Sequence, residues 1–595
     1  MDNSIQTNVK FDNVSFKTKQ GTCHVDTTFL SNRLSLLFSL DQRLHTSNQL
    51  LRVLAGEINY SGNIKFNDIC VDLSSYSEKI GYIPENEYSY STLTPYEKLM
   101  FACSLRYHTI KTTEEQHAIV KYIILKLKIN EYDKHSGSLI KRNISSLDKK
   151  LTEVAVKLIY NPNVLLLENP EVNMNAYITT YFLNTMKLIL ENDKTIIISM
   201  NSINNRIIHL FDDTTILSQG NVIYSGKVSS LNHYLHDIGY PCNEEDDTIQ
   251  YFMYIAQNPH IQLFFDDVWE TFTSNNNVYA HKPLENYYQQ DFEFKAQDNN
   301  NTVYWFNEII CLLVRETKLC FRNDRLLIFE LFMILLYNVF LGIIFQNTIY
   351  WNSTQSVVNW SETRFSIVTT ILLSNVLILT YPLISVYNHD FMVFKQEKYM
   401  YSFSRYILVK TFIEIIKTFL YVSIILGINY GLIGLYSNFW NLLLEFTLVV
   451  LSASTFVICI CCILSCGEKF VYAIYFSPQI LLCGLVIPVS DIFKYVQFVY
   501  YLCLYNYGIQ IVSIEEMTVI PPKFPKNQID ILSQVTYGCS YENITNYVCD
   551  QVTNEYAIFP RNHVQVENQM TYIQGLLGFV IIGRILTCIF MWCKK

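Results

Sequence analysis

The sequence predicts an α/β domain followed by an all-α membrane domain, and three observations support this prediction. At 595 residues, the chain is too long to fold around one hydrophobic core. Up to about residue 260, short continuous apolar runs alternate with amphipathic stretches, as in a sheet covered by helices on both faces. Half of the residues are hydrophobic, and this excess lies almost entirely after Leu326. We therefore predict domains at residues 1–260 and 305–595, joined by a linker at 261–304.

Three apolar runs in the first domain are candidates for buried parallel strands. They are LSLLFSL (Leu34–Leu40), VLLLEN (Val164–Asn169) and TIIISM (Thr195–Met200). The stretch LDKKLTEVAVKLIY (Leu147–Tyr160) has helical periodicity instead. From Thr271 to Thr302 the composition turns to Asn, Gln and Tyr, which indicates a loosely ordered linker.

Six long apolar stretches in the second domain are candidate membrane spans, because each can cross a hydrocarbon layer of about 30 Å. The predicted spans are Leu326–Phe345, Phe365–Tyr387, Ile407–Leu435, Asn441–Cys466, Phe470–Tyr507 and Tyr572–Trp592. Gly484, Pro488 and Asp491 interrupt the fifth stretch. We expect that stretch to bend or re-enter rather than to cross as one straight helix.

The basic residues orient these spans. Lysine and arginine gather before the first span and between the second and third, whereas residues 346–363 contain neither. By the positive-inside rule, both termini are expected in the cytosol. The polar N-terminus does not have the pattern of a cleavable signal peptide. We expect the plasma membrane as the location, with an internal membrane as the alternative.

Three further features are interpreted with this topology. Asn352, Asn359 and Asn543 begin Asn-x-Ser/Thr tripeptides in predicted outer loops and are candidate glycosylation sites, although an Asn-rich chain also produces such tripeptides by chance. Cys539 and Cys549 lie in a long polar loop of the oxidising compartment. A net charge of −9 without a basic tract argues against a nucleic-acid partner.

Four segments resemble one known family. Ile80–Arg106 resembles the segment around a Q-loop, and Asn143–Pro170 aligns without gaps to a signature helix and Walker B strand. Ile216–Cys242 resembles the end of the same family's nucleotide domain, and Phe394–Lys410 resembles the elbow that leads into the third span. Over nearly its whole length the chain resembles a half-transporter of the G subfamily of ATP-binding cassette (ABC) transporters.

The resemblance implies a fold, cofactors and partners. The implied fold is an ABC nucleotide-binding domain in front of a six-span membrane domain, and the implied cofactors are ATP and Mg²⁺. The family works as a dimer, so a homodimer or a heterodimer with another G-subfamily half-transporter is expected, together with a lipid-like or amphipathic substrate. The resemblance also implies a disulfide in the last outer loop, formed by Cys539 and Cys549.

The P-loop of this family is missing. A P-loop reads G-x-x-x-x-G-K-[ST], because glycine N–H groups cradle the phosphates and the lysine reaches the outer ones. The run LLRVLAGEINYSGNIKF (Leu50–Phe66) is similar to the segment after a P-loop. Counting back from it, the corresponding residues are Asp41, Leu44, Ser47, Asn48 and Gln49. The phosphate-binding lysine has become Ser47, and the magnesium-binding hydroxyl has become Asn48.

The other nucleotide motifs are also altered. Glu85 stands at the Q-loop glutamine, Asn175 at the D-loop aspartate and Asn201 at the switch histidine. The signature keeps Ser145, but its two glycines are Ser146 and Leu147, and the leucine should block close approach of the backbone to a phosphate.

The Walker B strand ends in two further replacements. Glu168 stands at the aspartate and is a possible residual magnesium ligand, whereas Asn169 stands at the carboxylate that polarises the attacking water. Because an amide cannot accept that proton, we expect no catalytic residue and no hydrolysis at this chain's own P-loop. A homodimer would then have two inactive sites, which favours a heterodimer.

The leading hypothesis is therefore a transporter subunit with an inactive ATP site. The alternative is a non-transporting pseudo-transporter that regulates or scaffolds a partner. A channel or lipid scramblase built on the same spans is a third hypothesis, for which no filter-like motif speaks.

Other candidate residues have a structural and a functional interpretation. Cys459, Cys461, Cys462 and Cys466 lie on an apolar span, where thiols usually pack rather than bind metal. Glu414 and Lys417, with Lys410, favour a local salt-bridged face over a functional site. For Arg584, deeper in the last span, a polar contact that couples the spans stays an open alternative. Aromatic residues that could line a substrate path are Tyr381, next to Pro382, and Tyr500, Tyr501, Tyr505 and Tyr507.

Overall fold

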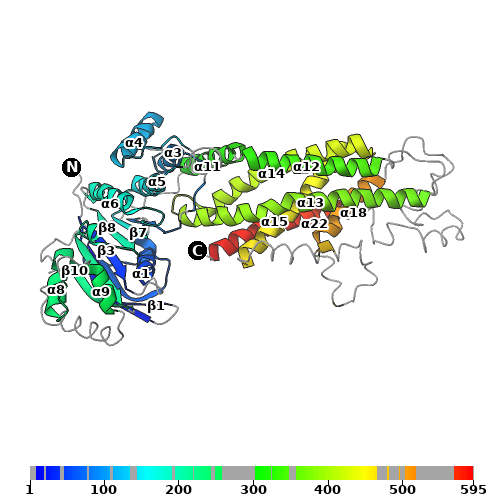
Figure 1. Cartoon of the computed structure of the whole chain (residues 1–595). Coiled ribbons are helices and arrows are strands. Elements are labelled where there is room, and N and C mark those ends of the chain that lie inside the picture. The colour runs from blue at the N-terminus through cyan, green and yellow to red at the C-terminus, as the bar shows by residue number, and fades with distance from the viewer. Residues whose placement is uncertain are drawn as a thin grey trace. The chain divides into compact units, whose positions relative to one another are not determined.

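The computed structural model divides the chain into two compact units, Met1–Asn307 and Glu308–Lys595. It describes most of residues 8–256 and 302–593; the longer stretches outside the description are 135–143, 257–301, 347–356, 465–478, 481–494, 496–502 and 518–568. The predicted linker up to residue 301, the interruption of the fifth apolar stretch, Cys539, Cys549 and Asn543 therefore lie outside the described residues, whereas the last three linker residues belong to a helix that begins at Thr302. Each unit is described separately below (Figure 1).

The first unit contains an antiparallel sheet and a mostly parallel one. The antiparallel sheet has the order β2-β1-β4-β5. Its strands are β1 (Val9–Lys17), β2 (Thr22–Phe29), β4 (Tyr60–Phe66) and β5 (Ile69–Cys70). Buried and exposed residues alternate along β2, as expected for a strand with one face towards the core.

The second sheet has the order β10-β9-β3-β8-β7-β6, and all its neighbouring strands are parallel except β9 and β10. Its strands are β3 (Leu34–Ser39), β6 (Ile80–Ile83), β7 (Val164–Glu168), β8 (Thr195–Met200), β9 (Asp213–Ser218) and β10 (Asn221–Lys227). Strands β3, β7 and β8 are buried at every position, which confirms the three strands predicted from their apolar runs.

Helices surround these sheets in the first unit (Figure 1). They are α1 (Thr46–Leu54), α2 (Leu73–Tyr76), α3 (Pro95–Tyr107), α4 (Thr113–Lys126), α5 (Ser146–Ile159), α6 (Ala176–Leu190), α7 (Asn205–Ile208), the 3₁₀ helix η2 (Val228–Ser230), α8 (Leu231–Asp237) and α9 (Thr248–Ala256). Helix α5 confirms the helix predicted from periodicity, and its capping residue Ser145 accepts a hydrogen bond from the N–H of Asp148 at 3.0 Å.

The second unit is helical. Its helices are α11 (Thr302–Arg322), α12 (Asp324–Phe345), α13 (Val357–Glu397), α14 (Phe403–Ile433), α15 (Phe439–Leu464), α18 (Leu504–Met517) and α22 (Gln569–Cys593). Among the described residues, five segments are long and apolar enough to cross a membrane: Leu327–Phe345, Thr363–Glu397, Phe403–Ile433, Phe439–Cys462 and Gln569–Phe590. They correspond to the first, second, third, fourth and sixth predicted spans. The end of the fifth predicted stretch enters α18.

Helix α13 is longer than a membrane is thick. Its 41 residues extend over about 60 Å at 1.5 Å per residue, twice the thickness of a hydrocarbon layer. Its first turn contains Asn359, one of the three glycosylation candidates. Its last turns carry the buried Asp390 and the carboxylate Glu397, so this end of the helix is polar.

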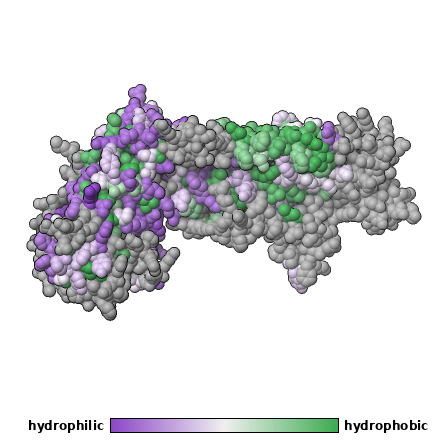
Figure 2. All heavy atoms as spheres, viewed as in Figure 1, coloured by the Kyte–Doolittle hydropathy of each residue, from purple (hydrophilic) through white to green (hydrophobic). Residues whose placement is uncertain are grey.

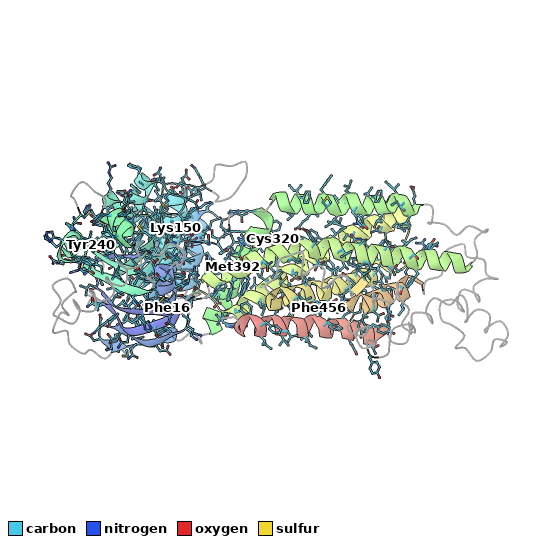
Figure 3. All side chains as sticks on the ribbon, turned by 60° about the horizontal axis from the view of Figure 1, so that its bottom comes forward. Phe16, Lys150, Tyr240, Cys320, Met392 and Phe456 are labelled. Atoms are coloured by element: carbon cyan, nitrogen blue, oxygen red, sulfur yellow. The ribbon has the colours of Figure 1, made fainter. Side chains whose placement is uncertain are left out.

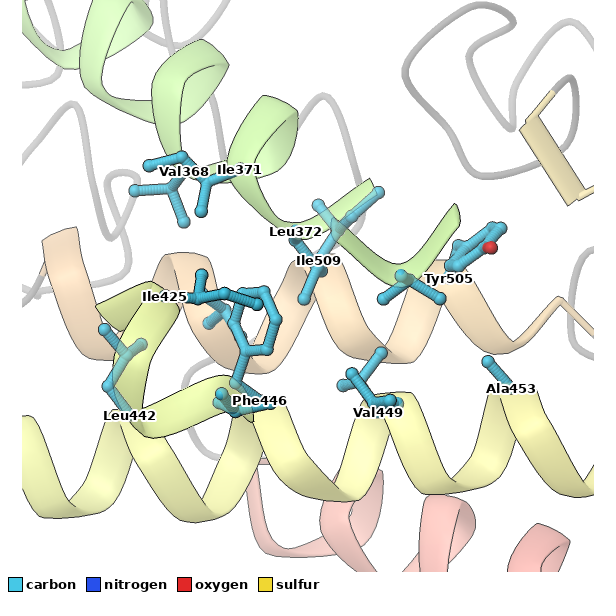
Figure 4. Close-up of a cluster of buried hydrophobic side chains, with 14 of the residues drawn as sticks. Val368, Ile371, Leu372, Ile425, Leu442, Phe446, Val449, Ala453, Tyr505 and Ile509 are labelled. Carbon is cyan, nitrogen blue, oxygen red and sulfur yellow. The ribbon is translucent and has the colours of Figure 1, made fainter. Parts of the chain in front are cut away.

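A core of buried hydrophobic side chains packs α13, α14, α15 and α18 together. Figure 4 shows Leu372 of α13, Ile425 of α14, Phe446 of α15 and Ile509 of α18 facing one another. The outer faces differ between the units: Figure 2 shows hydrophobic residues gathered over the helical unit and mostly hydrophilic ones on the described surface of the first unit. An apolar outer face on a helical bundle is what a lipid environment requires.

Candidate functional site

Three central strands of the six-stranded sheet end at one edge. β8 lies between β3 and β7, and Ser199 of β8 is in register with Leu37 of β3 and with Glu168 of β7. Because the carboxyl ends of parallel strands meet at the same edge, this edge is the usual ligand-binding side of such a sheet. The residues predicted at the P-loop (Asn48), Walker B (Glu168) and switch (Asn201) positions follow these strands and lie at this edge.

The helix α1 begins at this edge. The hydroxyls of Thr46 and Ser39 are joined by a hydrogen bond of 2.7 Å, and Ser199 Oγ donates to Asn48 Oδ1 at 2.7 Å. The side chain of Ser47 is 1% exposed, and no described residue hydrogen-bonds its hydroxyl. Gln49 follows in the same turn and is partly buried. Asp41 and Leu44 lie outside the described residues.

An ion pair occupies the end of β7. Arg52 Nη2 of α1 lies 2.7 Å from Glu168 Oε1, and Arg52 Nε donates to Glu168 Oε2 at 3.4 Å. The hydroxyl of Tyr82, from β6, donates to the same Oε2. The Glu168 side chain is 1% exposed and that of Arg52 is 44% exposed, so the carboxylate is shielded from solvent whereas the arginine side chain is in contact with it. We call Arg52, Tyr82 and Glu168 the Glu168 cluster.

Charge and burial fix the protonation of the two groups that bind Glu168. Burial alone would lower the pKa of Arg52, but the hydrogen bond and the charge of Glu168 raise it above its usual value. Burial, followed by the charge of Glu168, raises the pKa of the Tyr82 hydroxyl. At neutral pH, Arg52 is therefore a cation and Tyr82 a neutral donor.

A second bond ties the Q-loop position to the end of β7. Asn169 Nδ2 donates to Glu85 Oε2 at 2.7 Å, and the backbone N–H of Asn169 donates to Ser199 Oγ at 3.3 Å. Asn169 has a φ of 42°, in the left-handed region that asparagine tolerates better than most residues. On the other side, Lys150 Nζ of α5 donates to the carbonyls of Pro84 and Glu85, each at 3.1 Å. Figure 3 marks Lys150 within this unit.

A third bond fixes the switch position. Glu171 Oε1 accepts hydrogen bonds from the backbone N–H groups of Asn201, at 2.7 Å, and Ser202, at 3.4 Å. Glu171 is buried, and burial raises its pKa although these N–H groups act in the opposite direction. The loops that follow β6, β7 and β8 are thus connected by side-chain hydrogen bonds.

The signature and D-loop positions cap helices. Ser145 caps α5, and Ser146 and Leu147 form its first turn. Asn175 Oδ1 accepts from the backbone N–H of Ile178 at 2.8 Å and caps α6. Both caps are exposed. These positions therefore do not share the hydrogen-bonded network that joins Asn48, Glu85, Asn169 and Ser199.

Sequence reasoning missed four residues of this edge: Arg52, Tyr82, Lys150 and Glu171. The available signal was Glu168 itself, since a carboxylate at the end of a fully buried strand needs a counter-charge. The identity of that partner depends on which side chain reaches across from α1, and spacing alone does not give it.

Comparison with known proteins then places the chain. A family model described as ABC-2 type transporter matches residues 307–517. ABC transporter G family member 4 of Arabidopsis thaliana is 24% identical over 489 residues, which covers 80% of each chain. ABC transporter G family member 8 of the same plant is 24% identical over 483 residues, 80% of this chain and 78% of its own. These similarities support a half-transporter of the G subfamily of ABC transporters.

Three further similarities concern parts of this chain. The broad substrate specificity ATP-binding cassette transporter ABCG2 of Sus scrofa is 28% identical over 174 residues, 29% of this chain and 26% of its own. A probable ATP-dependent permease of Saccharomyces cerevisiae is 28% identical over 198 residues, 33% of this chain and 19% of its own. The solved ADP conformation of MJ1267, an ATP-binding cassette of an ABC transporter, aligns with a TM-score of 0.31 and 14% identity, covering 38% of this chain and 94% of that one.

The residues at this edge do not fit the Mg²⁺ ion that the family implies. Mg²⁺ requires near-octahedral oxygen ligands and is usually bound by one or two free carboxylates with water and phosphate. Here both Glu168 oxygens are bonded within the Glu168 cluster, and Glu85 Oε2 accepts the amide of Asn169. Asn48 Oδ1 accepts the hydroxyl of Ser199. No step of a reaction is therefore assigned to a metal here.

The helical unit contains an ion pair deep among its spans. Arg584 Nη2 of α22 pairs with Glu414 Oε2 of α14, which also accepts the hydroxyl of Tyr387 of α13 at 3.0 Å. The polar contact considered for Arg584 thus exists and joins three helices. Lys417 pairs with Glu330 of α12 at 2.7 Å.

The expectation of a local charged face on α14 is wrong. Lys410 contacts Asp390 of α13 at 2.6 Å and Glu316 of α11 at 2.5 Å. Together with the pairs of Glu414 and Lys417, these contacts all lead to other helices. Buried charges need counter-charges, and on the crowded inner side of α14 these come from its neighbours.

Three asparagines form another contact between the spans. Asn338 of α12 and Asn375 of α13 exchange amide hydrogen bonds of 2.8 and 3.1 Å, and Asn429 of α14 donates to Asn338 Oδ1 at 2.9 Å. All three side chains are fully buried. We call Asn338, Asn375 and Asn429 the asparagine cluster.

The aromatic candidates for a substrate path differ from one another. Tyr381 is 60% exposed on α13, whereas Tyr505 is buried in the core of the helical unit, as Figure 4 shows, and contributes to packing. Tyr507 packs against Tyr572 and Phe579. Tyr500 and Tyr501 lie outside the described residues. Cys459, Cys461 and Cys462 lie on α15, and Cys466 and Asn352 are outside the description.

Proposed function

We propose that this chain is one subunit of a dimeric half-transporter that moves a lipid-like or amphipathic molecule, and that its own ATP site is inactive. The observation that supports the inactive site most strongly is the pairing of Arg52 with Glu168. The carboxylate at the Walker B position is already neutralised by a side chain of its own domain. A metal–nucleotide complex would therefore have to compete with the hydrogen bonds that both carboxylate oxygens already accept.

The missing reaction chemistry supports the same conclusion. Hydrolysis needs a group that orients the attacking water, and Asn169 has an amide that already donates to Glu85. It also needs a cationic side chain that contacts the phosphates, and Ser47 stands where the family has that lysine. A cationic group that stabilises a transferring phosphate contributes roughly 10³–10⁵ in rate. Losing both functions together leaves no catalytic route at this P-loop.

A heterodimer fits these losses better than a homodimer. In the proposed complex, the partner's P-loop holds ATP and Mg²⁺ and faces the altered signature of this chain at Ser145–Leu147. This chain contributes its half of the membrane path. In the proposed topology, both termini of the chain are in the cytosol and its spans lie in the plasma membrane. Tyr381, which is exposed on α13, offers an aromatic ring that a lipophilic substrate could contact.

Co-reconstitution tests this proposal. The chain is placed in proteoliposomes alone and with an intact G-subfamily half-transporter from the same genome, and ATP-dependent movement of a fluorescent phospholipid is followed. We expect movement only with both subunits, lost when the partner's Walker B carboxylates are replaced and unchanged by Ser47→Ala in this chain. ATP-dependent movement by this chain alone would contradict the proposal.

The inert Glu168 cluster also favours a second candidate function, a regulatory or scaffold subunit. In that case the partner would move the lipid equally well without this chain. The chain would then change only the partner's amount, location or ATPase rate. The same reconstitution therefore separates the two functions.

A further inference from the structure

The Glu168 cluster lies where an ABC domain would place its divalent cation. Glu168 occupies the Walker B position, Asn48 the hydroxyl position of the P-loop and Glu85 the Q-loop position. The charge on the buried Glu168 carboxylate must be balanced, because an unpaired ion at 1% exposure would be strongly destabilising.

We propose that the guanidinium of Arg52 takes the place of the divalent cation at Glu168, so that this domain is complete without metal. Arg52 approaches both carboxylate oxygens, with 2.7 Å from Nη2 to Oε1 and 3.4 Å from Nε to Oε2. A planar fork of donors on a carboxylate is the arrangement in which arginine binds most specifically. This inference rests on the proposed inactive ATP site and names what fills its cation position.

The neighbouring groups bind the carboxylates without adding a second positive charge to that of Arg52. Tyr82 donates its hydroxyl to Glu168 Oε2 and so completes the bonds of that oxygen without adding charge. Asn169 offers an amide donor to the Glu85 carboxylate at 2.7 Å, where a metal-bound water would otherwise be the donor. Asn48 Oδ1 is taken by Ser199 at 2.7 Å. Both Glu168 oxygens, Glu85 Oε2 and Asn48 Oδ1 thus each accept a hydrogen bond from the protein.

The exposure of Arg52 makes the inference testable. Its side chain is 44% exposed, so shortening it opens a path from water to Glu168 without removing a core residue. In Arg52→Ala, the buried carboxylate loses its counter-charge and becomes available to a small cation. We therefore expect a latent cation site that the native arginine masks.

The experiment uses the full-length protein in detergent and measures its thermal unfolding midpoint in EDTA, Mg²⁺ or Mn²⁺, each at millimolar concentration. We expect no response of the wild type. Arg52→Ala should lower the midpoint by roughly 5 °C, and either cation should restore part of that loss. The double variant Arg52→Ala with Glu168→Gln should show a smaller drop in the unfolding midpoint than Arg52→Ala alone. Neither Mg²⁺ nor Mn²⁺ should change its midpoint, because the charge that attracts the cation is gone.

Two variants keep the test decisive. Arg52→Lys retains the charge and should remain insensitive to cations, as the matched control. Arg52→Gln keeps a donor at similar reach and replaces Arg52→Ala if that variant does not fold. A wild type stabilised by Mg²⁺ through Glu168, or a charge-removing variant that ignores both cations, would overturn the inference. Neither result depends on whether lipid transport is observed, so this test and the reconstitution can fail separately.

Discussion

Glu171 Oε1 accepts the backbone N–H of Asn201 at 2.7 Å, which joins the loop after β7 to the loop after β8. The carboxylate is buried, and its second hydrogen bond, from the N–H of Ser202, holds two successive peptide groups. In a nucleotide-driven domain these loops must move with the ligand. Here the side chain of Glu171 connects the two loops directly.

The first prediction concerns the order of this loop. Glu171→Ala removes the acceptor, so the amides of Asn201 and Ser202 should exchange with solvent roughly ten- to a hundredfold faster, because a hydrogen bond to a charged group contributes about 1.5–3 kcal/mol. Hydrogen exchange of the full-length protein, followed by mass spectrometry, measures this. Glu171→Gln is the matched control, since its amide oxygen still accepts. Equal exchange in all three proteins would show that the bond does not order the loop.

The second prediction concerns alkaline pH. Lys194 is buried and donates to Asn161 Oδ1 and the carbonyl of Pro162, both at 2.8 Å, and burial lowers its pKa to about 8. The unfolded chain keeps this proton up to about 10.5, so between the two values the unfolded state binds more protons and stability rises with pH. The gain is at most about 3 kcal/mol.

The measurement for Lys194 is a comparison of unfolding midpoints across this pH range. Lys194→Met has no titrating group there, so the midpoint of the wild type should rise relative to the variant as the pH increases from 8. Well below pH 8 the difference should be constant, because Lys194 is then protonated in both the folded and the unfolded wild type. A difference that does not change with pH would contradict the assigned pKa.

Continuous apolar runs predicted β3, β7 and β8, and hydropathy predicted five of the spans that the structure describes. Strands and spans can be predicted in this way because each depends on the order of apolar residues within its own segment. The Glu168 cluster depends on α1, β6 and β7 meeting, and the motif alignment showed only that Glu168 replaces an aspartate. Sequence could therefore predict that the site is altered, but not that Arg52 and Tyr82 fill it.

The membrane half shows the same limit. Arg584 and Glu414 were recognisable as costly charges in apolar stretches, yet they are 170 positions apart, and pairing over such a separation requires the packing of α14 against α22. The expected local face on α14 failed for that reason, since helical spacing describes only neighbours on one helix.

The third prediction tests this pair. Arg584→Met leaves Glu414 buried without its counter-charge and should destabilise the protein by about 3–5 kcal/mol, whereas adding Glu414→Gln should recover much of the loss. Thermal unfolding in detergent measures both. Lys417→Met is the control, because that lysine is 39% exposed and its pair should contribute at most about 1 kcal/mol. Additive losses in the double variant would refute the coupling.

The fourth prediction concerns the asparagine cluster. Asn338→Leu removes the oxygen that both Asn375 and Asn429 use, and it should cost about 1–2 kcal/mol by leaving their amides with fewer partners. Titration with a denaturing detergent, with the folded fraction followed at each concentration, measures the change in the free energy of unfolding. Thr370→Val is the control, because its hydroxyl bonds to Ser366 in its own helix. A loss no larger than that of the control would mean that the cluster does not hold the spans together.

The most direct test of the proposed inactivity of the ATP site is photo-crosslinking of the purified chain with azido-ATP and Mg²⁺, alone and beside an intact partner. Because side-chain hydrogen bonds and the Arg52–Glu168 pair occupy the edge where triphosphate and metal would bind, we predict no labelling of the chain alone that excess ATP suppresses. Labelling of this chain alone that ATP suppresses and Glu168→Gln abolishes would contradict that account.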